Sequence, residues 1–279
     1  MKMGWLHRMA GASALALLSV MALPGQDPNK GQTVQPIGKA PALPDDKPKK
    51  ESPPAVKPPA AGVLFSEGFA GSKLAADWRL MNADEQRWTL QPNKKSLLII
   101  TQNGLLTDSK NLKNYLLLNR ELPADDFELI VEESLQIQGV GNYAGTALFS
   151  DDKNYFWLDL QGDPWGDNIA RTPYFSKIFQ GKATNFGGER RFGRASQLEH
   201  IFLKVEREGN QYSGYYAYTD KPTGIEEIAW VKLGTLPWIN FHGKLMLAAA
   251  NFQDGPEVSA EYYSVLIRKK QAASQNPAH

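Results

Sequence analysis

Aromatic and polar side chains alternate along residues 155–161 of this sequence. Tyr155, Trp157, Asp159 and Gln161 share one parity, and Phe156, Leu158 and Leu160 share the other. In a β-strand the two parities face opposite ways, so one face is apolar and the other combines rings with a carboxylate and an amide. Rings of this kind can stack on a sugar while the polar groups bind its hydroxyls. We therefore predict a glycan-binding face made by Tyr155, Trp157 and Asp159 and extended by Trp165, just past the strand.

The opposite orientation of this strand is an alternative. Tyr155 and Trp157 would then fill a core between two sheets, and Phe156, Leu158 and Leu160 would point outward. Leu158 and Leu160 are the more natural pair for a core, which favours an exposed aromatic face.

Four arginines follow in residues 162–196, a stretch rich in Gly and aromatic residues that we interpret as a long loop inserted between strands. They are Arg171, Arg190, Arg191 and Arg194. A guanidinium can bind a carboxylate through two parallel hydrogen bonds, so an acidic polysaccharide or an acidic segment of a partner would suit them. We include Arg171 among the predicted binding residues. The alternative is a solvated loop whose aromatic side chains pack on the sheet and partly cover the Tyr155 face.

Hydrolysis of a glycosidic bond would need two carboxyl groups a few ångströms apart, one of them with a raised pKa. The candidates on neighbouring predicted strands are Glu128, Glu132, Glu133, Asp159 and Asp163, and they show no clustered E-x-D-x-x-E pattern. Glu133 is unusual because it shares the parity of apolar Phe127 and Leu129, which predicts a carboxyl on the core face. A strand end, a bulge or a functional role would each explain that position.

The composition excludes several classes of function. Lys and Arg number 31 and Asp and Glu 30, so the formal net charge is +1 and provides no concentrated basic surface for nucleic acid. The sequence has no Cys, which excludes disulfides, thiolate metal sites and a Cys nucleophile. His200 and His242 stand alone, without the spacing of metal ligands. These residues indicate no cofactor and no nucleic-acid partner.

The first 61 residues differ from the rest. Residues 1–25 combine Lys2 and Arg8 with an apolar run at 10–21, as in a signal peptide or an uncleaved N-terminal anchor. Residues 26–61 hold half of the 18 prolines and almost no large apolar residue, which predicts a disordered linker. We expect a secreted, periplasmic or cell-envelope protein that touches a membrane only through an uncleaved N-terminal segment. Residues 271–279 are expected to be a disordered tail, and no pattern indicates an oligomeric state.

Residues 62–270 have the pattern of an all-β domain. Short runs rich in β-branched and aromatic residues are separated by Gly, Asn, Asp and Pro, with few helical stretches between them. This spacing predicts two packed antiparallel sheets, as in a jelly-roll sandwich. The predicted strands are 63–66, 78–81, 87–91, 96–101, 115–120, 127–138, 143–149, 155–161, 198–208, 211–218, 229–233, 244–252 and 259–268.

The order of several segments resembles a known family. The segments are LFSEGFAGSKLAADW at 64–78, SLLIIT at 96–101, a strand ending at Arg120, YAGTALFSDDKNYFWLDL at 143–160, and the late strands LMLAAANF and VSAEYYSVLI. They are similar to the concanavalin A-like, laminin-G-like β-sandwiches, and among these to the sandwich at the C-terminal end of family 43 glycoside hydrolases. The resemblance covers about residues 62–268 and implies this fold for the domain.

The resemblance also implies a structural Ca²⁺ between the first and last strands, where Glu67 and Glu261 are the carboxylates in roughly the right places. No room remains among these segments for the hydrolases' separate catalytic propeller. We therefore expect a lectin-like, non-catalytic module that binds a polysaccharide or oligosaccharide. The alternatives are a glycosidase or lyase of sandwich fold that uses Glu132, Glu133 or Asp159, and an envelope domain that binds a protein.

Overall fold

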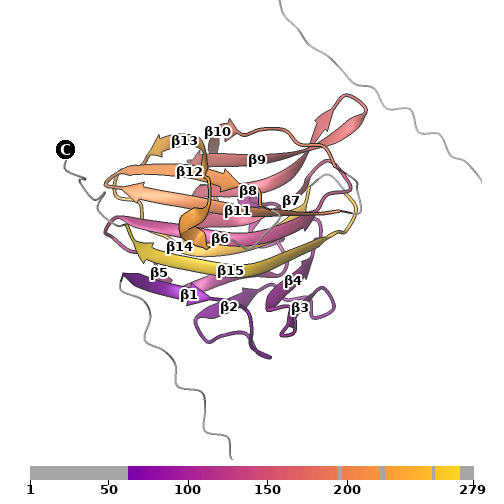
Figure 1. The fold of residues 1–279 in the computed structure, drawn as a ribbon, viewed down its shortest axis with the longest axis horizontal. Coiled ribbons are helices and arrows are strands. Elements are labelled where there is room, and N and C mark those ends of the chain that lie inside the picture. Colours follow the sequence, from indigo (N-terminus) through magenta and orange to yellow (C-terminus); the bar gives the residue numbers. More distant parts are fainter. Residues whose placement is uncertain (1–61, 194–196, 220–223, 253–254, 271–279) are drawn as a thin grey trace, which may run out of the picture. The chain divides into compact units, whose positions relative to one another are not determined.

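The computed structural model describes residues 62–193, 197–219, 224–252 and 255–270. In that part of the chain two antiparallel sheets pack face to face (Figure 1), which confirms the predicted all-β sandwich. The helical segments there are two 3₁₀ turns, η1 (Leu106–Asp108) and η2 (Ile225–Glu227), and no described helix is long and apolar enough to cross a membrane. The expectations for residues 1–61 and 271–279 lie outside the described residues.

One sheet has eight strands, with β1 (Val63–Glu67) pairing with the second half of β15. The order of the other seven is β13 (Val231–Pro237), β12 (Gln211–Ala217), β11 (Leu198–Glu208), β6 (Phe127–Gln136), β15 (Ser259–Lys269), β4 (Ser96–Ile100) and β3 (Trp88–Gln91).

The second sheet has seven strands. Their order is β10 (Lys182–Gly187), β9 (Asn168–Phe179), β8 (Asn154–Trp165), β7 (Asn142–Asp151), β14 (Lys244–Asn251), β5 (Tyr115–Glu121) and β2 (Trp78–Met81). The β7–β8 hairpin and its neighbour β9 occupy one half of this sheet, so residues 143–165 share their outer face with β9 and β14.

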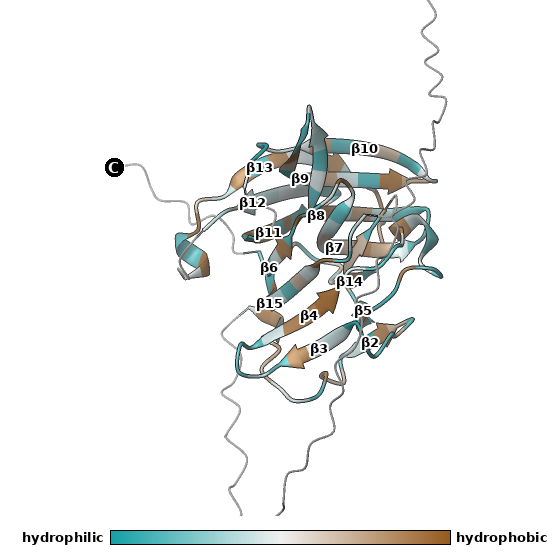
Figure 2. Cartoon of the chain, turned by 90° about the vertical axis from the view of Figure 1, so that its right-hand side faces the viewer, coloured by the Kyte–Doolittle hydropathy of each residue, from teal (hydrophilic) through white to brown (hydrophobic). Residues whose placement is uncertain are grey.

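Alternation of apolar and polar residues decides which side of each strand is buried. It appears as brown and teal bands along strands such as β11 and β15 in Figure 2. Phe156, Leu158 and Leu160 of β8 lie in the core between the sheets, whereas Tyr155 and Trp157 belong to a separate cluster on the outer face. Full burial of a Leu side chain stabilises the fold by about 1.5–3 kcal/mol, which holds the strand in this orientation. The predicted orientation of the strand is confirmed and the reverse one is wrong, but the expected exposure of the aromatic face is also wrong, because Tyr155 and Trp157 are both buried on the outer side of the sheet.

The interpretation of residues 162–196 as an inserted loop is wrong. Strand β8 continues to Trp165, and β9 and β10 follow as full members of the seven-stranded sheet. The alternation in β9 was obscured because its inward positions include Arg171 and Pro173 as well as Phe175. An Arg in a core position removes the apolar signal on which strand prediction depends.

Candidate functional site

A second apolar cluster lies on the outer face of the seven-stranded sheet. Its buried members come from β5, β7, β8, β9 and β14 and from the segment around η1: Leu106, Leu112, Tyr115, Tyr143, Ala147, Tyr155, Trp157, Ile178, Met246, Ala248 and Ala250. The rings of Tyr143 and Trp157 meet edge to face, with centroids 5.8 Å apart. Trp157 is only 8% exposed, so most of its ring already packs within the protein.

Residues 102–114, which we call the cover segment, lie over this cluster, in place of the predicted loop at 162–196. Leu106 and Leu112 of the segment are buried in the cluster. The Tyr143 hydroxyl donates to the Gly104 carbonyl at 3.0 Å, and the Asn82 amide donates to the Leu112 carbonyl at 2.7 Å. These bonds hold the segment against the sheet and leave Leu105, beside Gly104, exposed at the edge of the cluster.

A pocket of about 150 Å³ opens between the cover segment and strand β8. It is lined by Leu105, Leu106, Thr107, Tyr143, Tyr155, Trp157, Asp159, Gln161 and Phe252. Pockets for drug-sized ligands have roughly 300–1,000 Å³, so this one suits a small group or one edge of a sugar ring. Three predicted binding residues, Tyr155, Trp157 and Asp159, therefore share one pocket.

Asp159 is the polar centre of the pocket. It is 1% exposed; one carboxyl oxygen accepts the indole N–H of Trp157, and Oδ1 has no hydrogen-bond partner among the described residues. Asp159 is paired with Gly145 of β7, where an added Cβ would be 2.7 Å from the Asp159 Cβ. Only a glycine leaves room for Asp159 at that place.

The pKa of Asp159 is raised well above its ordinary value. Burial is the main cause, the Trp157 hydrogen bond opposes it, and the negative charge of Asp163 adds to it. Burial likewise raises the pKa values of Tyr143 and Tyr155. Burial therefore favours the protonated forms of these hydroxyl and carboxyl groups, which both donate and accept hydrogen bonds.

The pocket lining contains one carboxyl group. Asp163 lies four residues further along β8, about 13 Å along the backbone at the rise of a strand, and is not part of the pocket lining. Glu132 is on the outer face of the other sheet, where the His200 ring contacts it at 3.1 Å and the Ser264 hydroxyl donates to it at 2.9 Å. Glu132, a candidate of the glycosidase alternative, therefore lies on a different sheet from Asp159, and the pocket lining holds no second carboxyl.

Glu133 points into the core between the sheets, as its parity predicted. It is fully buried, and neither carboxyl oxygen has a partner among the described residues. Burial raises its pKa well above the ordinary value, and the charge of Asp159 adds to the shift. The neighbouring strand β15 has a bulge between Tyr262 and Ser264, directly opposite Glu133. The Glu133 carboxyl therefore lies between the two sheets. It is outside the pocket, which opens on the outer face of the seven-stranded sheet.

Trp165 and Asp163 lie on the same face of β8, beyond the pocket. Strand β7 pairs with β8 only as far as Gln161, so the end of β8 and the start of β9 form a ribbon that projects beyond β7 (Figure 1). Trp165 is 47% exposed, and the guanidinium of Arg190 lies 4.6 Å from its ring centre. Arg190 also hydrogen-bonds the Tyr174 hydroxyl, which donates to Asp163.

Arg171 is not part of this face. Its side chain is 1% exposed and points between the sheets, where its Nε lies 3.6 Å from Glu199. Arg191 binds the same carboxylate at 3.1 Å, and its cation lies 4.1 Å from the Tyr218 ring centre. Of the four predicted arginines, Arg190 is the one near Trp165, and Arg194 lies outside the described residues.

Glu67 and Glu261, the predicted calcium ligands, are separated by the strand register. Glu67 pairs with Val265, four residues from Glu261 on β15, which is about 13 Å along the strand. The Glu67 carboxylate accepts the backbone N–H of Phe69 at 2.7 Å, and Glu261 lies 3.3 Å from the ammonium of Lys94. The described residues contain no group of three or more His, Asp or Glu side chains placed to hold a metal.

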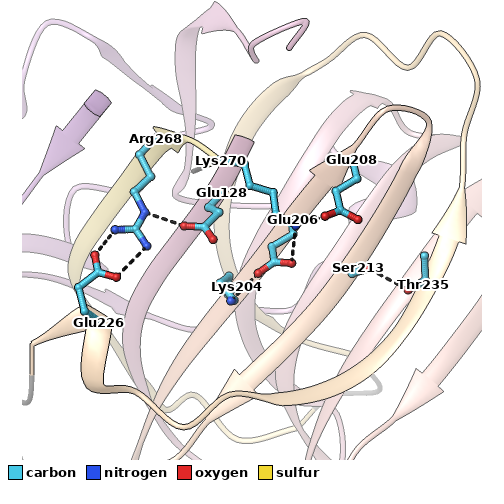
Figure 3. Close-up of polar contacts among 9 residues, drawn as sticks. All are labelled: Glu128, Lys204, Glu206, Glu208, Ser213, Glu226, Thr235, Arg268 and Lys270. Carbon is cyan, nitrogen blue, oxygen red and sulfur yellow. Dashed lines mark hydrogen bonds and ion pairs between the residues drawn. The ribbon is translucent and has the colours of Figure 1, made fainter. Parts of the chain in front are cut away.

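The outer face of the eight-stranded sheet carries a network of ion pairs, drawn in Figure 3. Arg268 binds Glu128 at 2.6 Å and also binds Glu226 of η2, while Lys204 binds Glu206 at 2.6 Å. Lys204 also lies 4.6 Å from the ring centre of Trp230, so residues 224–230 are held across this face.

Comparison with known proteins bears on the whole domain. A family model of the beta xylosidase C-terminal concanavalin A-like domain matches residues 66–236. A search of curated proteins finds no match. Among solved structures, the family 43 glycoside hydrolase BlXynB from Bacillus licheniformis is 18% identical with a TM-score of 0.57, and a xylan beta-1,4-xylosidase from Bacillus halodurans is 12% identical with a TM-score of 0.58.

Both similarities cover 78% of this chain but only 41% of each hydrolase, so this chain spans less than half of their length. A protein of unknown function from Saccharomyces cerevisiae is 12% identical with a TM-score of 0.50, over 71% of this chain and 98% of that one. At these identities the structures show a shared fold alone. Because the family model matches more than half of the chain, the protein belongs to the beta xylosidase C-terminal concanavalin A-like domain family.

Proposed function

We propose that the protein binds carbohydrate in the pocket at Asp159 and catalyses no reaction there. The observation that carries the proposal is a buried carboxyl with one unpartnered oxygen, set between aromatic rings in a pocket of about 150 Å³. A buried polar atom without a partner costs about 1–3 kcal/mol, and a ligand hydroxyl that pairs with it recovers that energy. The membership of the chain in a family named for xylosidases supports a sugar as the ligand.

The lining residues divide the work of binding. Tyr155 and Trp157 provide the apolar wall against which the C–H groups of a sugar ring pack. Asp159, in its protonated form, donates to one ligand oxygen, and the Gln161 amide contacts a neighbouring hydroxyl. Because the lining has a single carboxyl, it lacks the second group that glycosidic hydrolysis uses, and this favours binding over catalysis.

Binding of a panel of neutral oligosaccharides, followed by isothermal titration calorimetry, tests the proposal. We expect Asp159→Ala to weaken binding about 10- to 100-fold, because a buried hydrogen-bonding group is lost. Glu132→Ala is the matched control: it removes a carboxyl from the outer face of the other sheet and should leave binding unchanged. The site is refuted if wild type and Asp159→Ala bind with equal affinity and circular dichroism shows that both are folded. The non-catalytic role is refuted if the protein turns over a polysaccharide and this turnover depends on Asp159.

We further infer that the protein acts outside the cytoplasm, in a secreted, periplasmic or cell-envelope location. The support is the apolar run at 10–21 behind Lys2 and Arg8, with the proline-rich stretch after it. Fractionation of cells that express the full chain tests the inference, and recovery in the cytoplasm alone would contradict it.

A further inference from the structure

We propose that a second subsite lies at Trp165, so that the protein binds a neutral glycan chain lengthwise along β8 and does not hold a single sugar or chain end. This inference rests on the proposed function of the Asp159 pocket and extends it. Trp165 has the parity of Trp157 and Asp159 on β8, so all three side chains belong to one face.

Hydrogen bonds connect the pocket with Trp165. The Gln161 amide, part of the pocket lining, donates to Asp163 at 3.2 Å. The Tyr174 hydroxyl donates to the other oxygen of Asp163, and Arg190 in turn binds Tyr174. Polar groups therefore continue without interruption from the pocket to the exposed ring.

The position of Arg190 follows from the backbone. Residues 171 and 191 exchange N–H to carbonyl bonds of 2.8 and 2.9 Å, so the chain at 190–192 lies beside the start of β9 like a short extra strand. Arg191 points inward to Glu199, and alternation then turns Arg190 to the outer face. There its cation lies over one face of the Trp165 indole at 4.6 Å and holds the ring in place.

The length of this strip determines the kind of ligand. Trp165 is six residues from Asp159, which is about 20 Å at the rise of a strand. One sugar ring cannot span that distance, so a ligand that touches both places must be an oligosaccharide of several residues or part of a longer chain.

The local charges favour a neutral chain over an acidic one. Beside Trp165, the guanidinium of Arg190 lies near Tyr174, whose hydroxyl donates to Asp163, so a cation and a carboxylate of the described residues share this place. The other nearby arginines, Arg171 and Arg191, are already paired with Glu199. A uronic acid would be repelled by Asp163 and would compete with it for the guanidinium, whereas neutral hydroxyls can accept from the guanidinium and donate to Asp163.

Chain-length dependence of binding tests the inference with the full-length protein. Neutral oligosaccharides of two to eight residues are titrated into wild type, Trp165→Ala and Phe179→Ala. We expect the affinity of wild type to rise once the oligosaccharide is long enough to reach Trp165. Trp165→Ala should weaken binding of these long ligands roughly 3- to 10-fold and leave binding of short ligands unchanged. Phe179 is 45% exposed at the far end of β9, so Phe179→Ala should match wild type and controls for loss of an exposed ring.

Each contrary result has a separate meaning. If affinity does not depend on length, or if Trp165→Ala and wild type gain equally, the second subsite is refuted while the pocket stands. If oligosaccharides of uronic acids bind more tightly than neutral ones and Arg190→Gln abolishes the difference, the neutral ligand class is refuted. If wild type binds none of these glycans, the proposed function itself fails, and this inference fails with it.

Discussion

The outer faces of the two sheets bury ionisable groups in opposite ways. On the eight-stranded sheet Lys204 is only 7% exposed, yet it contacts the Glu206 carboxylate at 2.6 Å (Figure 3). It also lies over the rings of Tyr215 and Trp230. On the seven-stranded sheet Asp159 is more deeply buried, at 1% exposed, and has no cation against it among the described residues. The first face is neutralised by its own side chains, and the second leaves a polar atom for something else to satisfy.

This difference distinguishes the proposed binding face from the other face better than burial or hydrophobicity does. Both faces carry aromatic rings, apolar clusters and carboxylates. An ion-pair network with partners at 2.6–3.3 Å stabilises a surface and needs no ligand. A buried carboxyl that lines a pocket keeps a cost of about 1–3 kcal/mol in the absence of a ligand.

The largest effect is expected where the pocket face depends on a glycine. An added Cβ at Gly145 would lie 2.3 Å from the Leu158 carbonyl oxygen and 2.6 Å from the Asp159 Cα, both in the adjacent backbone. We expect Gly145→Ala to lower the free energy of unfolding by about 3 kcal/mol, measured by urea denaturation. An added Cβ at Gly224, beside η2 on the other face, would meet nothing within 4 Å. Gly224→Ala should therefore change the free energy of unfolding by less than about 0.5 kcal/mol. Equal effects would remove this contrast between the faces.

The next effect concerns the ion pairs. Burial raises the pKa of Glu206, but hydrogen bonds and charge from Lys204 outweigh it, so the net pKa is lowered. A lowered folded-state pKa stabilises the protein above the unfolded value of about 4.3, and this contribution is lost as the pH falls through the folded value. We expect Glu206→Gln to cost about 1.5–3 kcal/mol at pH 7 and to remove that acid-side slope in thermal unfolding. A cost that persists unchanged at pH 3 would contradict the assignment.

Asp159 should show the opposite sign. Its folded-state pKa is raised, so its contribution is fully present below the unfolded value of about 3.9 and is lost as the pH rises through the folded value. Asp159→Asn keeps an acceptor for the Trp157 N–H and cannot ionise. We expect this variant to be more stable than wild type at pH 8, on the order of 1 kcal/mol, and equal to it at pH 3. Destabilisation that grows with pH would show that the carboxylate has a cationic partner.

The smallest effect is expected for Arg268, whose two carboxylate partners differ in exposure. Arg268 binds Glu128, whose side chain is 13% exposed, and Glu226, which is 72% exposed. We expect Glu226→Gln to change the free energy of unfolding by less than about 0.5 kcal/mol, because solvent screens an exposed pair. This small effect should vanish in 1 M salt. Glu128→Gln should cost about 1 kcal/mol or more and resist salt. If the two substitutions were indistinguishable, burial would not explain the strength of this network.

Much of the fold was predictable because strand periodicity is a local property. The thirteen predicted segments all contain strands, and the parity of Phe156, Leu158 and Leu160 placed them in the core. Strands β9 and β10 were missed because their signal depends on distant partners. Arg171 occupies an inward position only because Glu199, 28 residues later, neutralises it.

The candidate site was predictable in part. Alternation brought Tyr155, Trp157 and Asp159 to one face, and the structure adds Tyr143, from the strand beside them. The cover segment was missed because its apolar residues, Leu105, Leu106 and Leu112, are too few and irregular to show periodicity. Its place depends on hydrogen bonds to Tyr143 and Asn82, which no local pattern encodes.

The sequence by itself determined the two-sheet architecture and the face on which the aromatic residues lie, because both follow from the period of two in a strand. Only the tertiary structure decided that Asp159 is buried without a cation while Glu206 is buried with one. That outcome depends on which strands become neighbours: Gly145 lies beside Asp159, and Lys204 and Lys270 approach Glu206. Charge compensation is a property of side chains that meet in space, and residues far apart in the sequence supply it.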